Sequence, residues 1–417
     1  MIIAGLLITT AAPLVTAGDW PQILGPARDG RAAADERLAE SWPSSGPSVA
    51  WRKPVGAGYA GLAVVGGRAI LFHRVGSREV VECLDTGSGR TLWSDGHETT
   101  FRPQVGSGDG PLCTPVVASG RVVTYGAQGV LSTHYLDDGQ LVWRRDTHRE
   151  FSAPEGYFGA GSTPLVVGDR VVVNVGGRTG GVVAFALETG EILWTATDEQ
   201  ASYSAPIEVA VNGRPHVLAV TRYRCLLIDA DGGAVRWDFP FGMRGPTVNG
   251  ASPILFRTAS ADDRPRLLVT SSYGIGSIAA AFDGSGVERL WEGTEALASQ
   301  YATPVVLDRH AFCIDGRDDL PPASLTCVDL VTGRATWTES DFGYGTLVAA
   351  GDLLIATKTD GEIVLLRANP ERFDRLGKAR PIRGTLRALP ALSAGMLYVR
   401  DDESLVCLDV GRDRRDP

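Results

Sequence analysis

The stretch that decides the fold is CVDLVTGRATW, residues 327–337, because related copies of it recur along the chain. A second clear copy, CLDTGSGRTLW, occupies residues 83–93. Looser copies occupy residues 133–143, 184–194, 227–237 and 281–291. Each copy ends in a tryptophan, and the spacing between successive tryptophans runs from 43 residues (Trp194 to Trp237) to 54 (Trp237 to Trp291). A period of this length is typical of propellers and other repeat architectures.

The order of residues in this motif suits two antiparallel strands joined by a tight turn. The aspartate and the serine or threonine can hydrogen-bond to turn amides, and the glycine provides the positive φ that the turn requires. The closing tryptophan has a large face to bury. Two further strands precede each motif, one opening at a small residue before proline, as in Thr163-Pro164, and one rich in valine, as in residues 170–174. Four antiparallel strands in about 45 residues form one propeller blade.

Counting these units predicts an all-β chain that forms a single eight-bladed β-propeller over residues 47–411, with four antiparallel strands per blade. Six units end at tryptophans, a seventh from about residue 343 to 366 lacks its tryptophan, and an eighth is cut short at residue 411. Residues 48–52 contain an unassigned Trp51, so we expect this N-terminal strand to complete the last blade and remove two exposed sheet edges. A seven-bladed ring is the alternative if the unit without tryptophan is irregular.

The segments outside the predicted ring differ from it in composition. Residues 1–17 are apolar and uncharged from Ile2 to Val15 and end in a small-x-small site, a pattern that predicts a cleaved signal peptide. A buried first strand is the alternative. Residues 18–46, rich in glycine, proline, serine and charge, predict an extended N-terminal arm laid on the propeller surface, and residues 412–417 a C-terminal tail. Export would place the protein in the periplasm or outside the cell.

Charge and composition exclude several classes of protein. The net charge of −9 argues against nucleic-acid binding, which requires a basic face. After residue 17 no stretch approaches the roughly 18 to 20 apolar residues of a membrane span, so we expect none. The six cysteines include no Cys-x-x-Cys pair, and only Cys313 and Cys327 could meet across one predicted hairpin. The pattern allows either a disulfide or two free thiols at that hairpin.

The repeated motif resembles the tryptophan-docking motif of quinoprotein alcohol dehydrogenases and of PQQ-like repeat proteins generally. The stretch DWPQILGPARDG, residues 19–30, is similar to the opening of PQQ-binding-like propeller proteins found in planctomycetes. The resemblance covers nearly the whole chain after residue 17 and implies a propeller comparable in architecture to the β-barrel assembly scaffold BamB. It also implies PQQ with Ca²⁺ as a possible cofactor, because some members of the family are enzymes. The docking residues are expected to be Trp51, Trp93, Trp143, Trp194, Trp237, Trp291 and Trp337.

The chain departs from the quinoprotein dehydrogenases in ways that bear on chemistry. Those enzymes have a vicinal disulfide under the cofactor, and this sequence has no Cys-Cys pair. It also has no Cys-x-x-Cys-His for an attached haem. No residue aligns with the Ca²⁺ ligands or the catalytic aspartate of those enzymes. The sequence therefore assigns no catalytic residue and no metal ligand.

Ligands of propellers usually bind at the central axis, where the loops that enter the inner strands meet the turns between second and third strands. Arginine binds carboxylates with two parallel donors, so a mouth rich in arginine and tyrosine suits an anionic ligand. The alternative is that these side chains satisfy each other and the loop backbones. The residues expected at this mouth are Arg102, Tyr157, Tyr203, Arg244, Asn249, Tyr273, Tyr301, Asp315, Arg317, Tyr344, Lys358 and Arg387.

Two functions follow from these observations. The first is an exported, non-catalytic binding or scaffold propeller, which would bind an envelope protein or a small anionic ligand at the axial mouth or the loops, as a monomer. The second is a PQQ- and Ca²⁺-dependent dehydrogenase that oxidises an alcohol or a sugar. An aspartate or glutamate gathered with an asparagine at metal-ligand distance would favour the enzyme; axial carboxylates already paired with arginines would favour the scaffold.

Overall fold

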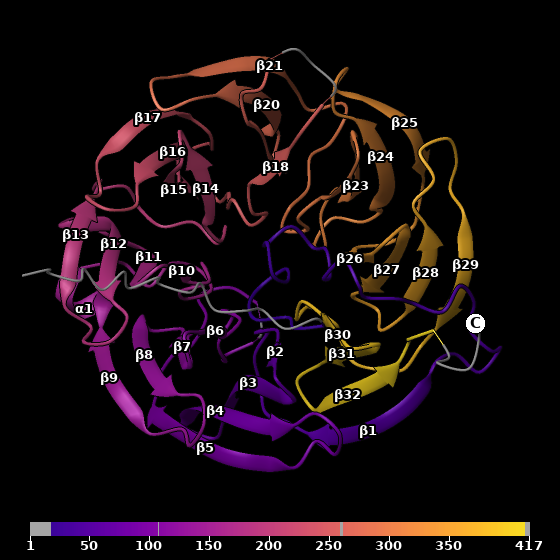
Figure 1. Cartoon of the computed structure of the whole chain (residues 1–417), viewed down its shortest axis with the longest axis horizontal. Coiled ribbons are helices and arrows are strands. Elements are labelled where there is room, and N and C mark those ends of the chain that lie inside the picture. The colour runs from indigo at the N-terminus through magenta and orange to yellow at the C-terminus, as the bar shows by residue number, and fades with distance from the viewer. Residues whose placement is uncertain (1–17, 107, 259–261, 413–417) are drawn as a thin grey trace, which may run out of the picture.

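The computed structural model describes residues 18–106, 108–258 and 262–412. Eight four-stranded antiparallel sheets in these residues surround a central axis as blades (Figure 1). The prediction of an all-β, eight-bladed propeller is thereby confirmed. The seven-bladed alternative is wrong, because the unit without tryptophan forms a regular four-stranded sheet. The predicted signal peptide and all but the first residue of the predicted tail lie outside the described residues.

Every blade runs from an inner strand near the axis to an outer strand at the rim (Figure 1). Blades 1 and 2 consist of β2 (Ala63–Val65), β3 (Arg68–Val75), β4 (Arg78–Asp85), β5 (Thr91–Glu98), β6 (Val116–Ala118), β7 (Arg121–Tyr125), β8 (Val130–Tyr135) and β9 (Leu141–Asp146). A short helix α1 (Thr147–Phe151) follows. Blades 3 and 4 consist of β10 (Leu165–Val167), β11 (Arg170–Gly177), β12 (Gly180–Ala186), β13 (Ile192–Ala196), β14 (Ile207–Val211), β15 (Arg214–Val220), β16 (Arg224–Asp229) and β17 (Val235–Pro240).

The second half of the ring continues in the same order. Blades 5 and 6 consist of β18 (Ile254–Phe256), β19 (Arg266–Ser271), β20 (Gly276–Phe282), β21 (Val287–Gly293), β22 (Val305–Leu307), β23 (His310–Asp315), β24 (Ser324–Asp329) and β25 (Arg334–Glu339). Blades 7 and 8 consist of β26 (Gly345–Ala350), β27 (Leu353–Lys358), β28 (Ile363–Arg367), β29 (Arg375–Ala379), β30 (Ala391–Ser393), β31 (Met396–Arg400), β32 (Ser404–Asp409) and the N-terminal β1 (Ser48–Pro54).

The ring is closed by β1, which pairs antiparallel with β32 and places Trp51 opposite Cys407. The predicted closure by an N-terminal strand is therefore confirmed. A polar contact links this strand to blade 1, because Lys53 Nζ of β1 lies 3.2 Å from the Glu82 carboxylate of β4. Within blade 1, His73 Nε2 lies 3.1 Å from the same carboxylate. Because His73 Nδ1 accepts a hydrogen bond from the Gly56 N–H at 2.8 Å, Nε2 carries the proton and donates to Glu82. This hydrogen bond, with weaker help from Thr91 and Lys53, lowers the pKa of Glu82 to about 2.

The tryptophans of the repeat make one recurring contact between neighbouring blades. Each indole Nε1–H donates to a backbone carbonyl of the next blade, at 2.7 to 3.0 Å. The turn glycine lies against the indole: a Cβ on Gly89, where φ is +69°, would be 2.6 Å from the Trp51 ring. The donor–acceptor pairs are Trp51–Thr86, Trp93–Leu136, Trp143–Leu187, Trp194–Ala230, Trp237–Asp283, Trp291–Leu330 and Trp337–Asn369.

Blade 7 lacks this tryptophan, and the N-terminal arm supplies a ring in its place. In blade 6 the tryptophan pairs with the third strand just before a register shift, as Trp337 does with Cys327. The matching position in blade 7, opposite Leu365, is Gly377. Trp42 of the arm packs over it, with Cε3 only 3.5 Å from where a Gly377 Cβ would lie. In the described residues no acceptor reaches Trp42 Nε1, which is buried.

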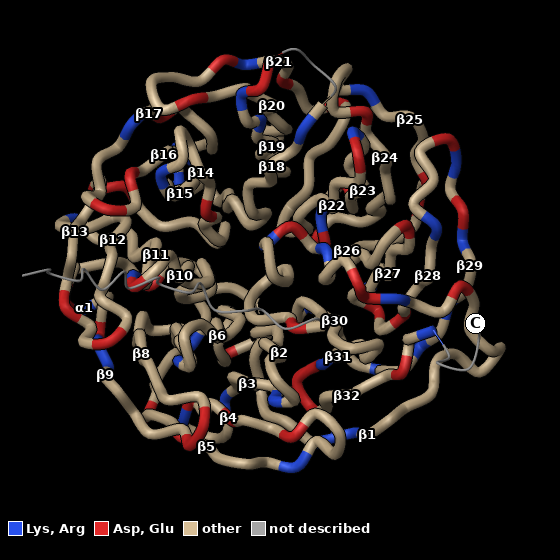
Figure 2. The backbone as a smooth tube through the Cα atoms, viewed as in Figure 1, with Lys and Arg blue, Asp and Glu red and all other residues tan. Residues whose placement is uncertain are grey.

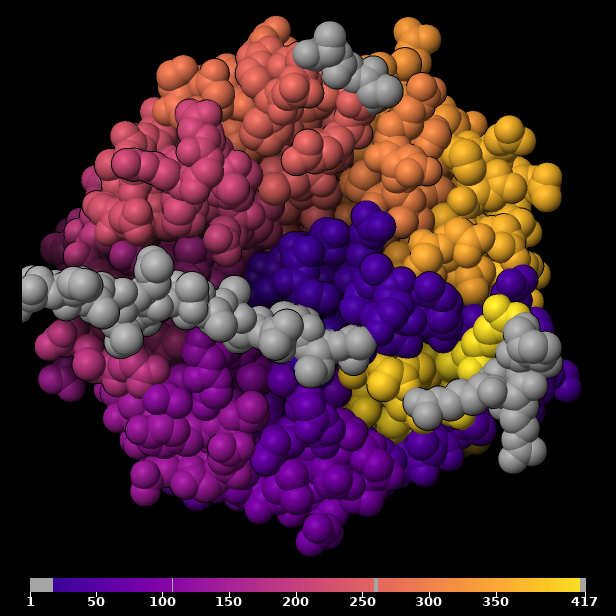
Figure 3. All heavy atoms as spheres, viewed as in Figure 1, coloured from indigo at the N-terminus to yellow at the C-terminus, as the bar shows by residue number. Residues whose placement is uncertain are grey.

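The arm, residues 18–46, also enters the axial channel and is more deeply buried than a surface segment would be (Figure 3). Trp20 is 1% exposed, and its backbone exchanges two hydrogen bonds with Val64 of β2, at 2.7 and 2.8 Å. Arg28 is 2% exposed and reaches the carbonyls of Pro164 and Pro206, at the starts of two inner strands. Asp19 accepts a hydrogen bond from Gly66 at 3.0 Å, so the arm enters from the end of the ring that carries the turns between first and second strands.

The possible Cys313–Cys327 disulfide does not form. In the β23–β24 ladder Cys313 faces Thr326, whereas Cys327 faces Phe312. Since consecutive residues of a strand point to opposite faces of the sheet, the two thiols lie on different faces. All six cysteines are buried and free, and burial raises the pKa of the Cys327 thiol to about 11.

Candidate functional site at the loop face

The loops that enter the inner strands and the turns between second and third strands lie at one end of the ring, opposite the end where the arm enters. We call this end the loop face. Asn249 organises part of it, because its side-chain amide donates to the carbonyls of Thr221 at 3.1 Å and of Arg222 and Phe241 at 3.3 Å. The sequence placed Asn249 at the mouth as a ligand-binding residue; in the structure its amide nitrogen holds two loops together.

One half of the loop face, over blades 6 to 8, is a network of paired charges around Asp318. The Asp318 carboxylate accepts hydrogen bonds from Arg387 at 2.8 Å, Tyr301 at 3.2 Å and Thr359 at 3.1 Å. Burial raises the pKa of Tyr301 well above its usual value, so this hydroxyl stays protonated and remains a donor. Tyr301 and Arg387, both expected at the mouth, thus contact the same carboxylate, and each already has this partner.

Arg317 and Tyr273 lie at the border of this network. Arg317 pairs with Asp319, with Nε 3.0 Å from the carboxylate, and its guanidinium lies 4.4 Å from the centre of the Tyr273 ring. The Tyr273 hydroxyl accepts a hydrogen bond from Gln300 Nε2 at 2.8 Å. Arg317 therefore already has a carboxylate partner.

Three of the expected site residues are engaged with neighbouring residues of the loop face. Tyr344 packs against Tyr301 with ring centres 4.6 Å apart, and its hydroxyl accepts from the N–H groups of Tyr301 and Ala302. Asp315 accepts from the Ala298 N–H at 2.6 Å. Lys358 pairs with Glu362 at 2.9 Å. Burial raises the pKa of Tyr344 and of Asp315 above their usual values.

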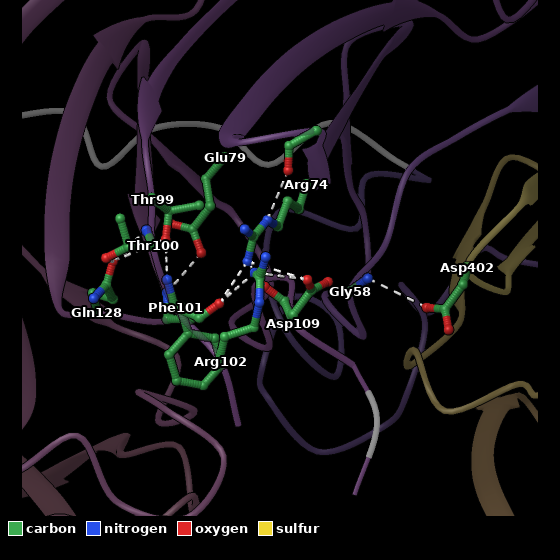
Figure 4. Close-up of polar contacts among 12 residues, drawn as sticks. Gly58, Arg74, Glu79, Thr99, Thr100, Phe101, Arg102, Asp109, Gln128 and Asp402 are labelled. Carbon is green, nitrogen blue, oxygen red and sulfur yellow. Dashed lines mark hydrogen bonds and ion pairs between the residues drawn. The ribbon is translucent and has the colours of Figure 1, made fainter. Parts of the chain in front are cut away.

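Arg102 lies in a separate cluster over blades 1 and 2 (Figure 4). Its Nη1 donates to the Phe101 carbonyl at 2.8 Å and to Asp109 at 3.0 Å. Arg74, which is 5% exposed, donates to the same Phe101 carbonyl and to the Asp109 carbonyl, both at 2.8 Å. Arg74 was missed from the sequence because it lies within a strand, and its partners are loop carbonyls about 27 and 35 positions away, which no local pattern reveals.

The half over blades 3 to 5 differs, because Arg222 and Arg244 have no carboxylate partner among the described residues. Arg222 donates to the carbonyls of Thr247 and, at 2.7 Å, of Gly245. Arg244 is exposed, beside Met243, which is 46% exposed. The Tyr203 hydroxyl accepts from the Phe158 N–H at 3.0 Å, and burial raises its pKa. Tyr157 is half-buried there, and its carbonyl accepts from the Gln104 N–H at 2.9 Å.

The residues at this face do not fit a Ca²⁺–PQQ centre. Within the described ranges, no three histidine, cysteine, aspartate or glutamate side chains are placed to hold a metal ion. Three carboxylates of this face are engaged with arginines: Asp109 with Arg74 and Arg102, Asp318 with Arg387, and Asp319 with Arg317. Asn249 donates its side-chain nitrogen to three loop carbonyls, and its Oδ1, the atom that could ligate a metal ion, is buried without a hydrogen-bond partner in the described structure; this single oxygen has no acidic cluster to complete a Ca²⁺ site within the described residues.

Residues 77–339 match the family PQQ_2, described as outer membrane protein assembly factor BamB. The chain belongs to this family. An outer membrane protein assembly factor BamB from Shewanella oneidensis is 22% identical over 266 residues, 61% of this chain and 64% of that relative. The match thus spans less than two thirds of the relative's own length.

Two solved structures share the propeller fold. BamB from Moraxella catarrhalis aligns with a TM-score of 0.63 and 16% identity, over 89% of this chain and 99% of that one. The quinohemoprotein alcohol dehydrogenase from Comamonas testosteroni aligns with a TM-score of 0.69 and 15% identity, over 97% of this chain and 82% of that one. At these identities a scaffold and an enzyme align about equally well, so the likeness shows the fold alone.

Proposed function

We propose that this chain is an exported scaffold propeller that holds a protein partner of the cell envelope on the blade 3–5 half of its loop face. The observation that carries the proposal is Arg222, which the described structure presents at the mouth with two loop carbonyls and no carboxylate. The family description, an outer membrane protein assembly factor, supports an envelope partner. In the described residues no helix is long and apolar enough to cross a membrane.

The chemistry of this half suits a protein surface. An arginine without a carboxylate can bind one from a partner through parallel N–H donors. Arg222 and Arg244 supply the charge, Met243 supplies exposed apolar surface, and Tyr203 and Tyr273 supply rigid rings. Arginine, tyrosine and methionine are enriched in protein interfaces. Lys and Arg are interspersed with Asp and Glu around the ring (Figure 2).

A site-specific crosslink tests the proposal. A photoreactive amino acid at Met243 should form one defined adduct with an envelope protein in cells, and the double variant Arg222→Ala, Arg244→Ala should lose it. The matched control is Leu193, which is 44% exposed on the outer strand β13 and should give no such adduct. Equal adducts at both positions would contradict the proposal. Tight, Ca²⁺-dependent PQQ binding with dye reduction in the presence of an alcohol or sugar would replace it with a dehydrogenase.

A further inference from the structure

Inner strands of the blades present backbone groups to the axial channel. In blade 1, β2 and β3 are joined by a two-residue turn, so Val65 and Arg68 form a hydrogen-bonded pair. The N–H and C=O of the preceding residue, Val64, therefore point away from β3 and into the channel. Trp20 of the arm hydrogen-bonds to both groups: the Val64 N–H donates to the Trp20 carbonyl at 2.8 Å, and the Trp20 N–H donates to the Val64 carbonyl at 2.7 Å.

The arm also forms backbone hydrogen bonds to the equivalent residue of two other blades. Val117 of blade 2 donates its N–H to Pro21 at 2.8 Å. Ala349 of blade 7 donates to Gly30 and accepts from Ala32, both at 2.8 Å. The arm thus acts as an added strand on one side of the channel, which satisfies edges that a closed ring of blades leaves open.

Blades 3 and 4 have the same edge with no such strand on it. Their equivalent residues are Val166 and Ala210, next to the terminal pairs Val167–Arg170 and Val211–Arg214. In the described part of the chain, no backbone group pairs with the channel side of either residue. A hollow of about 390 Å³ separates them from the arm. Its volume lies in the range of roughly 300–1,000 Å³ that ligand sites occupy.

The hollow is acidic. Glu208 of β14, which is exposed, and Asp29 of the arm, which is half-buried, line it, and partial loss of hydration raises the pKa of both carboxyls. Among the described residues lining it, Arg28 is the sole cation, and its Nε donates to Gln22 at 2.7 Å while its Nη atoms donate to the two proline carbonyls. No described cation pairs with Glu208. A cation that entered the hollow would favour the charged form of these carboxylates and so offset the cost of their reduced hydration.

We propose that this hollow binds an extended, lysine- or arginine-bearing peptide segment of another protein. The segment adds as a strand to the open edges at Val166 and Ala210 and places its cation beside Glu208. Main-chain hydrogen bonds would supply affinity and the carboxylate would supply selectivity for charge. This site is separate from the loop face, because it is bounded by the arm and the inner strands.

Fluorescence anisotropy of the full chain with dye-labelled Val-Lys-Val-Lys-Val and Val-Glu-Val-Glu-Val tests the proposal. The lysine peptide should bind at least about tenfold more tightly, and Glu208→Gln should weaken it about tenfold. Ala210→Pro removes the edge N–H without removing a bond to β15 and should weaken it roughly threefold. Affinity should also fall with added salt, and as the pH falls through the raised pKa of Glu208, because the neutral carboxyl no longer attracts the lysine.

Two controls keep the result specific. Glu191→Gln, at an exposed position outside the hollow, and the loop-face double variant Arg222→Ala, Arg244→Ala should leave lysine-peptide binding unchanged. Melting curves should match between Glu208→Gln and the parent chain, since the two side chains have the same shape. Equal binding of the two peptides, or an affinity that Glu208→Gln leaves unaltered, would overturn the proposal.

Discussion

The two sides of the axial channel are built from the same inner strand but are completed differently. At blades 1, 2 and 7 the arm forms backbone hydrogen bonds to Val64, Val117 and Ala349. At blades 3 and 4 the described structure leaves Val166 and Ala210 facing the hollow. The repeat thus determines where backbone groups point, whereas the non-repeating arm determines which of them are satisfied. Function can differ between sides of a ring whose blades are nearly equivalent.

The largest expected effect concerns the occupied side, where the arm should be an integral part of the core. Trp20→Ala should lower the free energy of unfolding by about 3–5 kcal/mol, because the ring is 1% exposed and its removal leaves a cavity. Urea titration followed by tryptophan fluorescence measures this change. Leu92→Ala, at a 45% exposed residue, is the control and should cost under about 0.5 kcal/mol. Equal, small effects would mean that the arm merely rests on the ring.

A second prediction compares the tryptophan that the arm supplies with one that the repeat supplies. Phenylalanine keeps an aromatic ring but has no N–H donor. Trp51→Phe loses the hydrogen bond to Thr86 at 2.7 Å, whereas Trp42 makes none in the described structure. Urea titration should therefore show Trp51→Phe to cost about 1 kcal/mol more than Trp42→Phe. A larger cost for Trp42→Phe would show that its indole N–H has a partner.

The smallest expected effect is at the junction of β1 with blade 1. The pKa of Glu82 is lowered from 4.5 to about 2 in the folded protein, so the carboxylate stabilises the fold above pH 4.5 and loses that contribution as the pH falls towards 2. Partial exposure screens the charge, and we expect Glu82→Gln to cost under about 1 kcal/mol at pH 7. As the pH falls from 4.5 towards 2, the free energy of unfolding of the Glu82→Gln variant should also decrease less steeply than that of the parent chain. Identical slopes in pH-dependent urea titrations would contradict this assignment.

The repeat predicted the fold because each blade is a local unit, and residues such as Gly89 and Trp93 carry their turn and packing roles within about 50 residues. Even the closing strand was recognisable from the unassigned Trp51. The arm was harder to interpret, because Trp42 meets Gly377 and Arg28 meets Pro164 and Pro206 only after the ring has formed. Local patterns contain no information on such distant contacts.

The candidate site could be predicted only in part, for a related reason. The sequence indicated which loops converge and listed Tyr301 and Arg387 among the residues of the mouth, but that both contact the Asp318 carboxylate is seen only in the structure. It could not indicate that Tyr344 and Asp315 would turn to backbone N–H groups of neighbouring loops. Buried polar atoms take the partner that the folded loop offers, and loop conformations are the part of this fold that the repeat specifies least.

Hydrogen exchange resolved to single amides tests the central claim, that one side of the channel is completed by the arm and the other is open. The account predicts that the N–H groups of Val64, Val117 and Ala349, which each donate to the arm at 2.8 Å, exchange slowly, whereas those of Val166 and Ala210 exchange fast. Adding the lysine peptide should slow hydrogen exchange at the N–H groups of Val166 and Ala210 and leave the other three amides unchanged. Equal protection at all five amides in the free protein would contradict the account.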